Sequence, residues 1–167
     1  MELRRIPSGA LAGALAAAVW AAQQPLDKKV FGTDYDDVEL LGKLVTRDSG
    51  WQAAGLALHL ANGAAFGTVY TLVRPLIPGP PQTAGVAAGL AEHAATWPLT
   101  ALIDRSLTGN RRAFAQSAWR HALFGLVLGE IERRLNPPDR FEPLEQVPVS
   151  SNGHGNIEHA AAGATEA

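Results

Sequence analysis

Three segments of the chain repeat one histidine–glycine spacing, forwards in two of them and in reverse in the third. The residues involved are His59, Gly63 and Gly67; His121, Gly125 and Gly129; and, in reverse order, Gly85, Gly89 and His93. A spacing of four places each histidine on the small-residue face of its own helix. Such faces are where membrane helices meet, so we expect the three imidazoles to converge at a similar depth.

Other polar side chains accompany these histidines inside otherwise apolar segments. Glu92 and Arg120 each directly precede one of the histidines, and Asn62 lies one helical turn from the third. A charge inside a bilayer costs several kcal/mol unless it is paired or hydrated. We therefore expect Glu92 and Arg120 to pair with each other or with the histidines.

This polar cluster has several chemical interpretations. The simplest is interhelical hydrogen bonding, in which each bond contributes about 1 kcal/mol or less. The second is a proton-responsive or proton-conducting site, because histidine titrates near neutral pH and Glu–His chains recur in proton relays. A haem or metal site on three imidazoles is a further alternative, although no helix carries two histidines at spacing three or four. Lipid or ligand binding completes the set, and we expect no cofactor and no metal.

The elements that must hold these residues are four long segments that are nearly free of charge. We place them at residues 6–26, 50–73, 82–103 and 113–131. A bilayer core requires roughly 20 apolar residues per helix, so residues 1–136 are predicted to form an all-α integral membrane bundle of four transmembrane helices. The alternative is a soluble helical bundle with Ala/Gly-rich helices buried all round. The segments lack the charged stripe that surface helices carry.

Small residues at spacing four recur along these segments and predict close helix packing. The predicted packing positions are Gly9, Gly13, Gly63, Gly67, Gly85, Gly89, Gly125 and Gly129. Pro98 interrupts the third segment and leaves the carbonyl of Ala94 without its helical donor, which predicts a kink. Three of the four tryptophans, Trp20 among them, lie toward one end of the segments, as an interfacial aromatic belt would.

The regions outside the four segments are polar. Residues 27–48 form a charged loop, in which Asp34 is predicted to cap a short amphipathic helix that lies on the membrane or covers the bundle. Residues 137–167 are rich in Pro, Gly, Ser and Ala without periodicity, which predicts a disordered tail. His154 and His159 in this tail could bind metal, but a solvated linker is the simpler interpretation.

Composition excludes several classes of function. The 167 residues carry 14 Lys and Arg against 16 Asp and Glu, so no basic surplus is present for binding nucleic acid. The absence of cysteine excludes disulfides, thiolate metal sites and thiol catalysis. No serine lies in a nucleophile elbow and no glycine-rich loop follows a predicted strand. We therefore expect no enzymatic activity.

Two stretches carry a family resemblance. One is His93-Ala-Ala-Thr96-Trp97-Pro98-Leu99, and the other is His121 followed by Gly129-Glu130-Ile131-Glu132-Arg133-Arg134. With the layout of the first two segments, they make residues 9–135 similar to the YagU-like family of small bacterial inner-membrane proteins. The resemblance implies a multispan inner-membrane protein of undefined mechanism, linked to acid tolerance. The short first loop and the C-terminal tail depart from the family, so a function located there does not carry over.

These observations predict a multi-pass protein of the bacterial plasma membrane, with the lipid bilayer as its first partner and no nucleic-acid partner. Arg4 and Arg5 precede the first segment closely and favour a cytoplasmic N-terminus. The same region resembles a secretory signal, but its length and small-residue stripe predict a retained span. The expected function is a proton-responsive or proton-conducting envelope protein. The alternative is a structural or assembly partner of another membrane protein, or a homo-oligomer, with the small-residue face of the first span and the acidic 27–48 loop as contact surfaces.

Overall fold

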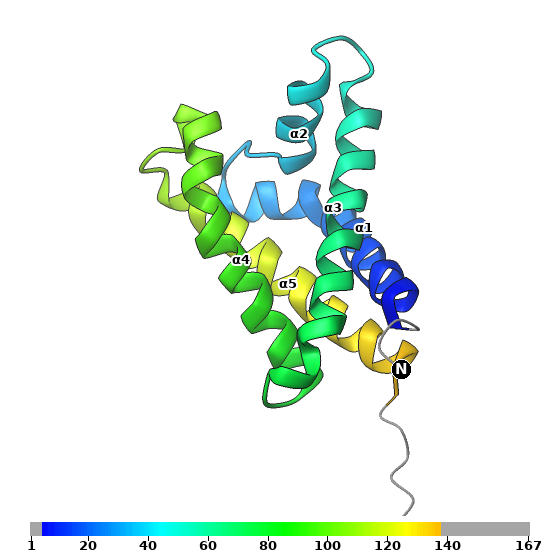
Figure 1. Ribbon diagram of the computed structural model, residues 1–167. Helices are drawn as coiled ribbons and strands as arrows, with labels where there is room; N and C mark the ends of the chain where they lie inside the picture. The colour runs from blue at the N-terminus through cyan, green and yellow to red at the C-terminus, as the bar shows by residue number, and fades with distance from the viewer. Residues whose placement is uncertain (1–4, 138–167) are drawn as a thin grey trace, which may run out of the picture. The chain divides into compact units, whose positions relative to one another are not determined.

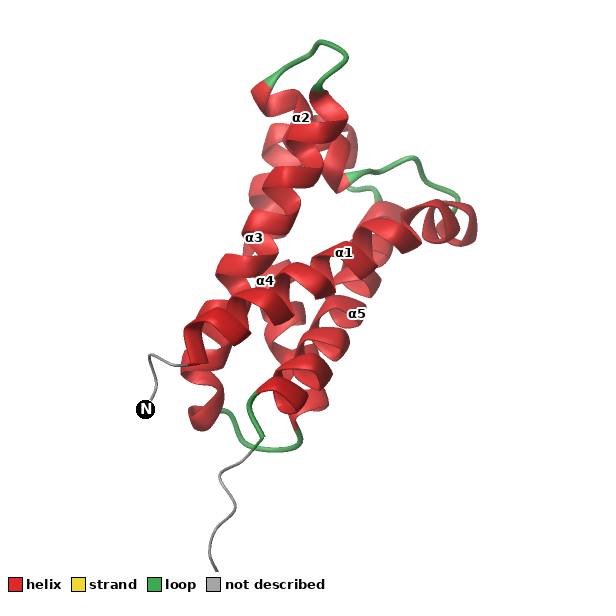
Figure 2. Cartoon of the chain, turned by 90° about the vertical axis from the view of Figure 1, so that its right-hand side faces the viewer, coloured by secondary structure: helices red, strands yellow, loops and turns green. Residues whose placement is uncertain are grey.

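The computed structural model describes residues 5–137, and this part of the chain consists of helices joined by short connections (Figure 1). The α-helices are α1 (Ile6–Phe31), α2 (Asp37–Val45), α3 (Trp51–Val73), α4 (Pro81–Ile103) and α5 (Arg111–Leu135). Figure 2 shows no strand in the described residues, so the predicted all-helical class is confirmed for them. The predicted tail from residue 138 onward, with His154 and His159, lies outside the described residues.

Each predicted span lies within one long helix, except that Gly50 precedes the first residue of α3. Two of the helical stretches, Ile6–Phe31 and Trp51–Leu76, are long and apolar enough to cross a membrane. Helix α1 contains Pro25 and continues past the predicted end at residue 26. It ends at Gly32, which donates its N–H to the carbonyl of Lys28 and has a φ of 61°. This left-handed conformation, which glycine adopts without steric cost, brings the N–H of Thr33 to the same carbonyl at 3.2 Å.

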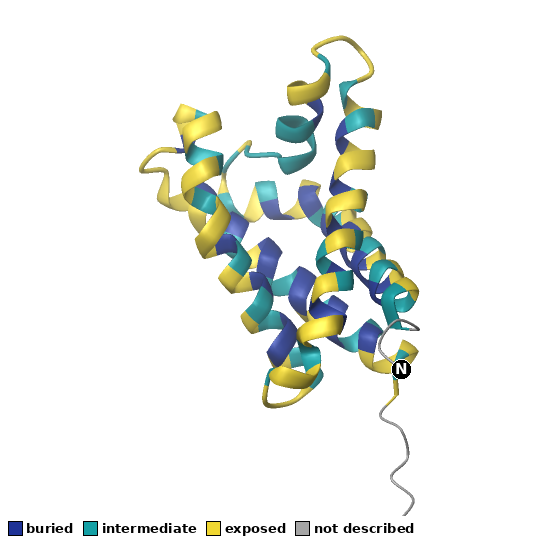
Figure 3. Ribbon diagram, in the orientation of Figure 1, coloured by how far each residue is buried: buried dark blue, intermediate teal, exposed yellow. Residues whose placement is uncertain are grey.

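The long helices pack as two pairs, α1 with α3 and α4 with α5, and α1 also packs along α5. Helices α3 and α4 diverge from the turn at residues 74–80 that joins them, and α2 packs on the N-terminal part of α3 (Figure 1). Buried residues gather along α1 and α5, while much of α3 and α4 is exposed (Figure 3). The apolar core consists of Ala12, Ala16, Ala17, Trp20, Tyr70, Phe124 and Leu128.

Glycines bring the backbones of both helix pairs into direct contact. Between α1 and α3, a Cβ atom added to Gly13 would overlap the carbonyl group of Gly63. Between α4 and α5, a Cβ atom on Gly85 would overlap the carbonyl group of Gly125. The glycines predicted at helix contacts all lie at these two crossings: Gly9, Gly13, Gly63 and Gly67 at the first, and Gly85, Gly89, Gly125 and Gly129 at the second.

This arrangement changes one expectation about assembly. The small-residue face of α1 is covered by α3 of the same chain. It is therefore not the free contact surface that the assembly alternative required. The outer side of α1 instead exposes large apolar side chains: Leu11, Leu15, Val19, Leu26 and Val30.

Helix α2 is capped by Asp36, so the prediction that Asp34 caps the helix is wrong. The Asp36 carboxylate accepts a hydrogen bond of 3.0 Å from the N–H of Glu39, which would otherwise be an unpaired donor in the first turn. Asp34 lies two residues earlier and its side chain is exposed. Further along, Gly42 of α2 and Gly55 of α3 bring these two helices into backbone contact.

Helix α4 continues through Pro98 to Ile103. Two threonines near the proline turn their hydroxyl groups to the backbone of the preceding turn. Thr96 donates to the carbonyl of Glu92 at 2.9 Å, and Thr100 donates to that of Thr96 at 3.1 Å. The predicted kink at Pro98 stays a prediction.

Candidate functional site

Arg120 lies at the centre of a buried charged network. Its guanidinium donates to both carboxylate oxygens of Asp27, at 2.6 and 2.7 Å, and to Asp37 at 2.6 Å. A further bond of 3.1 Å reaches the carbonyl oxygen of Tyr35. The side chain of Arg120 is fully buried. Because its ion-pair partners are Asp27 and Asp37, the prediction that it pairs with Glu92 or the histidines is wrong. Its long side chain instead reaches the end of α1 and the start of α2.

Neighbouring side chains complete the hydrogen bonds of this network. Gln116 donates to Asp27 at 2.7 Å, the hydroxyl of Tyr35 donates to Asp37 at 2.5 Å, and the indole N–H of Trp20 donates to Asp37 at 3.2 Å. The Asp27–Arg120–Asp37 triad thus joins α1, α5 and α2. With two carboxylates and one guanidinium, it carries one net negative charge.

Two groups of the loop before α2 have shifted pKa values for identifiable reasons. Burial raises the pKa of the Tyr35 hydroxyl, and the neighbouring charge of Asp37 raises it further. Burial alone would also raise the pKa of Asp36, but the Lys28 ammonium at 2.6 Å and the Glu39 amide bring it below its usual value. Tyr35 is therefore a neutral hydrogen-bond donor and Asp36 a carboxylate at neutral pH.

Two of the three predicted histidines pack against the indole of Trp20, and the third lies beside one of these two. The ring centroid of Trp20 lies 5.1 Å from that of His59 on α3 and 4.6 Å from that of His121 on α5. His93 on α4 lies 5.0 Å from His121. Trp20 is buried, so its predicted place in an interfacial belt is wrong. We call His59, His93, His121 and Glu92 the histidine cluster.

The histidine cluster is poorly provided with hydrogen-bond partners. His121 donates from Nδ1 to the carbonyl of Ser117 at 2.8 Å, and the hydroxyl of Ser117 lies 3.2 Å from Nδ1 of His93. The Nε2 atoms of His59 and His93 are buried without a partner. The Nε2 atom of His121 faces a carboxylate oxygen of Glu92 across 3.9 Å, too far for a hydrogen bond.

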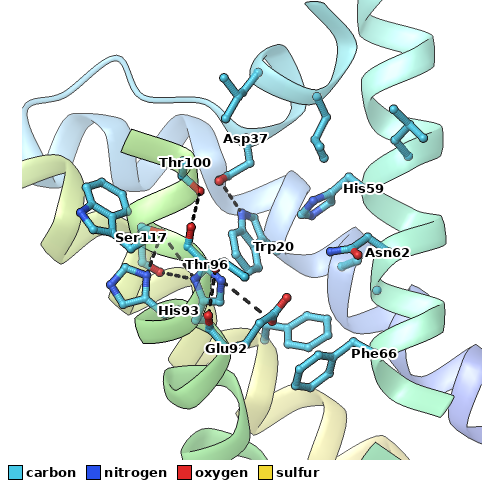
Figure 4. A pocket seen from close by; sticks show the side chains of 18 of the residues that line it. Trp20, Asp37, His59, Asn62, Phe66, Glu92, His93, Thr96, Thr100 and Ser117 are labelled. Atoms are coloured by element: carbon cyan, nitrogen blue, oxygen red, sulfur yellow. Dashed lines mark hydrogen bonds and ion pairs between the residues drawn. The ribbon is translucent and has the colours of Figure 1, made fainter. Parts of the chain in front are cut away.

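The histidine cluster opens into a cavity of about 490 Å³ that all five α-helices line. Figure 4 shows Trp20, His59 and Glu92 directed into this space, with Asn62 and Phe66 on the α3 side. Asn62 thus shares the cavity with the histidines, as the sequence placed it beside them. Helix α2 contributes Asp37 and three leucines to the same cavity, namely Leu40, Leu41 and Leu44.

Metal binding has no ready ligand set in the part of the chain that the structure describes. No group of three or more His, Asp or Glu side chains in residues 5–137 is arranged to hold a metal ion. His93 lies beside His121, whereas His59 and His121 each pack against the indole of Trp20.

Sequence reasoning missed several members of this site, namely Trp20, Asp27, Tyr35, Asp37, Gln116 and Ser117. Some of them carry a signal that could have been used. Gln116 and Ser117 lie four residues before Arg120 and His121, so each polar pair shares a helix face. Asp27, Tyr35 and Asp37 carry no such signal, because the place of residues 27–48 over the bundle depends on the helix packing.

Comparison with family models, with curated proteins and with solved structures gives no match for this chain. The resemblance to the YagU-like family therefore stays a prediction. The fold and the site described above are the basis for assigning a function.

Proposed function

We propose that this chain is a four-span membrane protein that takes up protons at the histidine cluster. The observation that carries this proposal is the facing pair formed by His121 and Glu92. Because Nδ1 of His121 donates to a carbonyl, Nε2 of the neutral ring is an acceptor, and it faces the Glu92 carboxylate, a second acceptor, at 3.9 Å. The pair therefore lacks a donor, and one added proton supplies it.

The distribution of exposed and buried groups supports the membrane assignment. Helices α4 and α5 have 23 and 25 residues, and at about 1.5 Å per residue each exceeds the roughly 30 Å hydrocarbon core. The two charges near the middle of these helices, Glu92 and Arg120, face the cavity and the interior. Large apolar side chains face outward on the long helices, among them Leu15, Val19, Leu56, Val69, Leu90, Leu99 and Leu126.

The surroundings of the cluster support proton uptake. The titratable and charged groups that line the same cavity are His59 from α3, His93 from α4, Asp37 from α2 and Tyr35 from the loop before it. From α1 the facing group is the indole of Trp20, which carries no charge. No lysine or arginine among residues 5–137 lines the cavity, and the nearby guanidinium of Arg120 is paired with the carboxylates of Asp27 and Asp37.

Membrane fractionation is the first test of this proposal. The chain should stay in the membrane pellet after carbonate extraction at high pH. Recovery in the soluble fraction would overturn the four-span assignment.

Tryptophan fluorescence tests proton uptake, because a proton that enters the His121–Glu92 pair changes the charge close to the indole of Trp20 and therefore its emission. A variant that keeps Trp20 alone, with phenylalanine at the other three tryptophans, is placed in liposomes and titrated between pH 8 and pH 5. We expect the emission of Trp20 to change as the pH falls, and we expect Glu92→Gln and His121→Gln to abolish or shift this change. Glu39→Gln, at a more exposed carboxylate paired with Lys43, is the control. A flat titration, or the same titration in all variants, would overturn the proposal.

A further inference from the structure

The cavity beside the histidine cluster has the size and lining of a small-molecule site. Its volume of about 490 Å³ lies within the range of ligand pockets. Aromatic rings form much of its wall: Trp20, Tyr35, Phe66, Trp97 and Phe124. Aromatic faces attract cations through their electron-rich centres.

The charges of this lining select against anions. Glu92 and Asp37 both line the cavity, and no lysine or arginine of the described residues does. Asp37 already accepts bonds from Arg120, Tyr35 and Trp20. The carboxylate of Glu92 accepts none among the described residues, and its side chain is 22% exposed. Glu92 is therefore the carboxylate available to a ligand.

The rim of the cavity carries large apolar side chains beside the polar Asn62 and Thr96. Leu44, Leu58, Leu99 and Ile103 line it, and each is 40% or more exposed. A ligand that fits this combination has a positive charge for the inner carboxylate and an apolar body for the rim. In the neutral ring of His121 the Nε2 atom, 3.9 Å from Glu92, carries no proton. It therefore does not compete with a ligand for the Glu92 carboxylate.

We propose that this cavity binds a lipophilic organic cation, with Glu92 as its counter-ion and the aromatic rings around its charge. This inference rests on the proposed function, because proton and cation compete for the same carboxylate. When Glu92 is protonated, binding of the cation releases that proton to solvent, and a fall in pH drives the reverse exchange. Glu92, Asp37, Tyr35 and the three histidines are the titratable groups that face the ligand.

The test uses tetraphenylphosphonium and tetraphenylborate, two ions of matched shape and opposite charge, with the purified full chain in detergent. We expect saturable binding of the phosphonium by equilibrium dialysis at pH 8 and none of the borate. Glu92→Gln should weaken phosphonium binding at least tenfold, Glu92→Asp should retain part of it, and the control Glu39→Gln should leave it unchanged. Equal binding of both ions, binding unaffected by Glu92→Gln, or no saturable binding would overturn the inference.

The pH dependence separates this inference from the proposed function. Competition with a proton predicts that phosphonium binding weakens at least tenfold between pH 8 and pH 5. If binding requires Glu92 but is the same at both values, the cation site stands and proton uptake fails. If the Trp20 titration depends on Glu92 but no phosphonium binds, proton uptake stands and the cation site fails.

Discussion

Arg120 and Glu92 both lie inside long helices and both are charged, but their surroundings differ. Arg120 is fully buried and its guanidinium makes hydrogen bonds to Asp27, Asp37 and the carbonyl of Tyr35. Glu92 faces a cavity, and its nearest basic atom is Nε2 of His121 at 3.9 Å. A fully bonded charge of this kind holds helices together, while an unbonded one remains available to a proton or a ligand.

Removal of Arg120 should have the largest effect on stability. Arg120→Met leaves the carboxylates of Asp27 and Asp37 facing each other without a cation, and breaking a buried ion pair in this way costs about 3–5 kcal/mol. Thermal and denaturant unfolding in detergent measure the loss. Arg134→Met is the matched control, because that side chain is 70% exposed. Equal losses in the two variants would mean that the network does not hold the fold.

Gly89→Ala should have the second-largest effect on stability. It disturbs the position of the histidine cluster and leaves its charges unchanged. A Cβ atom at Gly89 would overlap the carbonyl of His121, so α4 and α5 must move apart, at a cost of about 1–3 kcal/mol. Gly50→Ala is the control, since a Cβ atom added at Gly50 would lie 4.0 Å from its nearest neighbour, a side-chain carbon of Thr46. A loss of stability confined to Gly89→Ala, with a changed Trp20 titration, is the expected result.

The Lys28–Asp36 pair at the edge of the network should have a smaller, pH-dependent effect. The folded-state pKa of Asp36 is lowered, so its contribution is present above its usual pKa of about 4 and is lost as the pH falls below that value. Lys28→Met should lower the free energy of unfolding by at most about 1 kcal/mol at neutral pH. The difference from the unmodified chain should shrink toward pH 3; a difference that is constant with pH would contradict this assignment.

Glu92→Gln should have the smallest effect on stability. The substitution removes a charge that has no hydrogen-bond partner among the described residues, so we expect a change within about 0.5 kcal/mol. The same unfolding measurement applies. A loss of 2 kcal/mol or more would show that Glu92 is bonded like Arg120, and the contrast between the two regions would disappear.

The sequence predicted the positions of the long helices well, because charge-free segments and glycine spacing are properties of single helices. It also grouped the three histidines and Glu92, which line one cavity. It failed for the partners of Arg120, since Asp27 near the end of α1 and Asp37 at the start of α2 reach Arg120 only through tertiary packing. It misplaced Trp20 as well, because distance from a helix end does not tell which side of the helix faces the core.

The central claim is that α4 crosses the membrane and carries the histidine cluster into it. Because the chain has no cysteine, single cysteines can be placed at the exposed positions Pro78, before α4, and Ser106, after it. With a cytoplasmic N-terminus, a membrane-impermeant maleimide added to intact spheroplasts should label Ser106→Cys and spare Pro78→Cys. Equal labelling of the two positions would place both ends of α4 on one side of the membrane and contradict the four-span account.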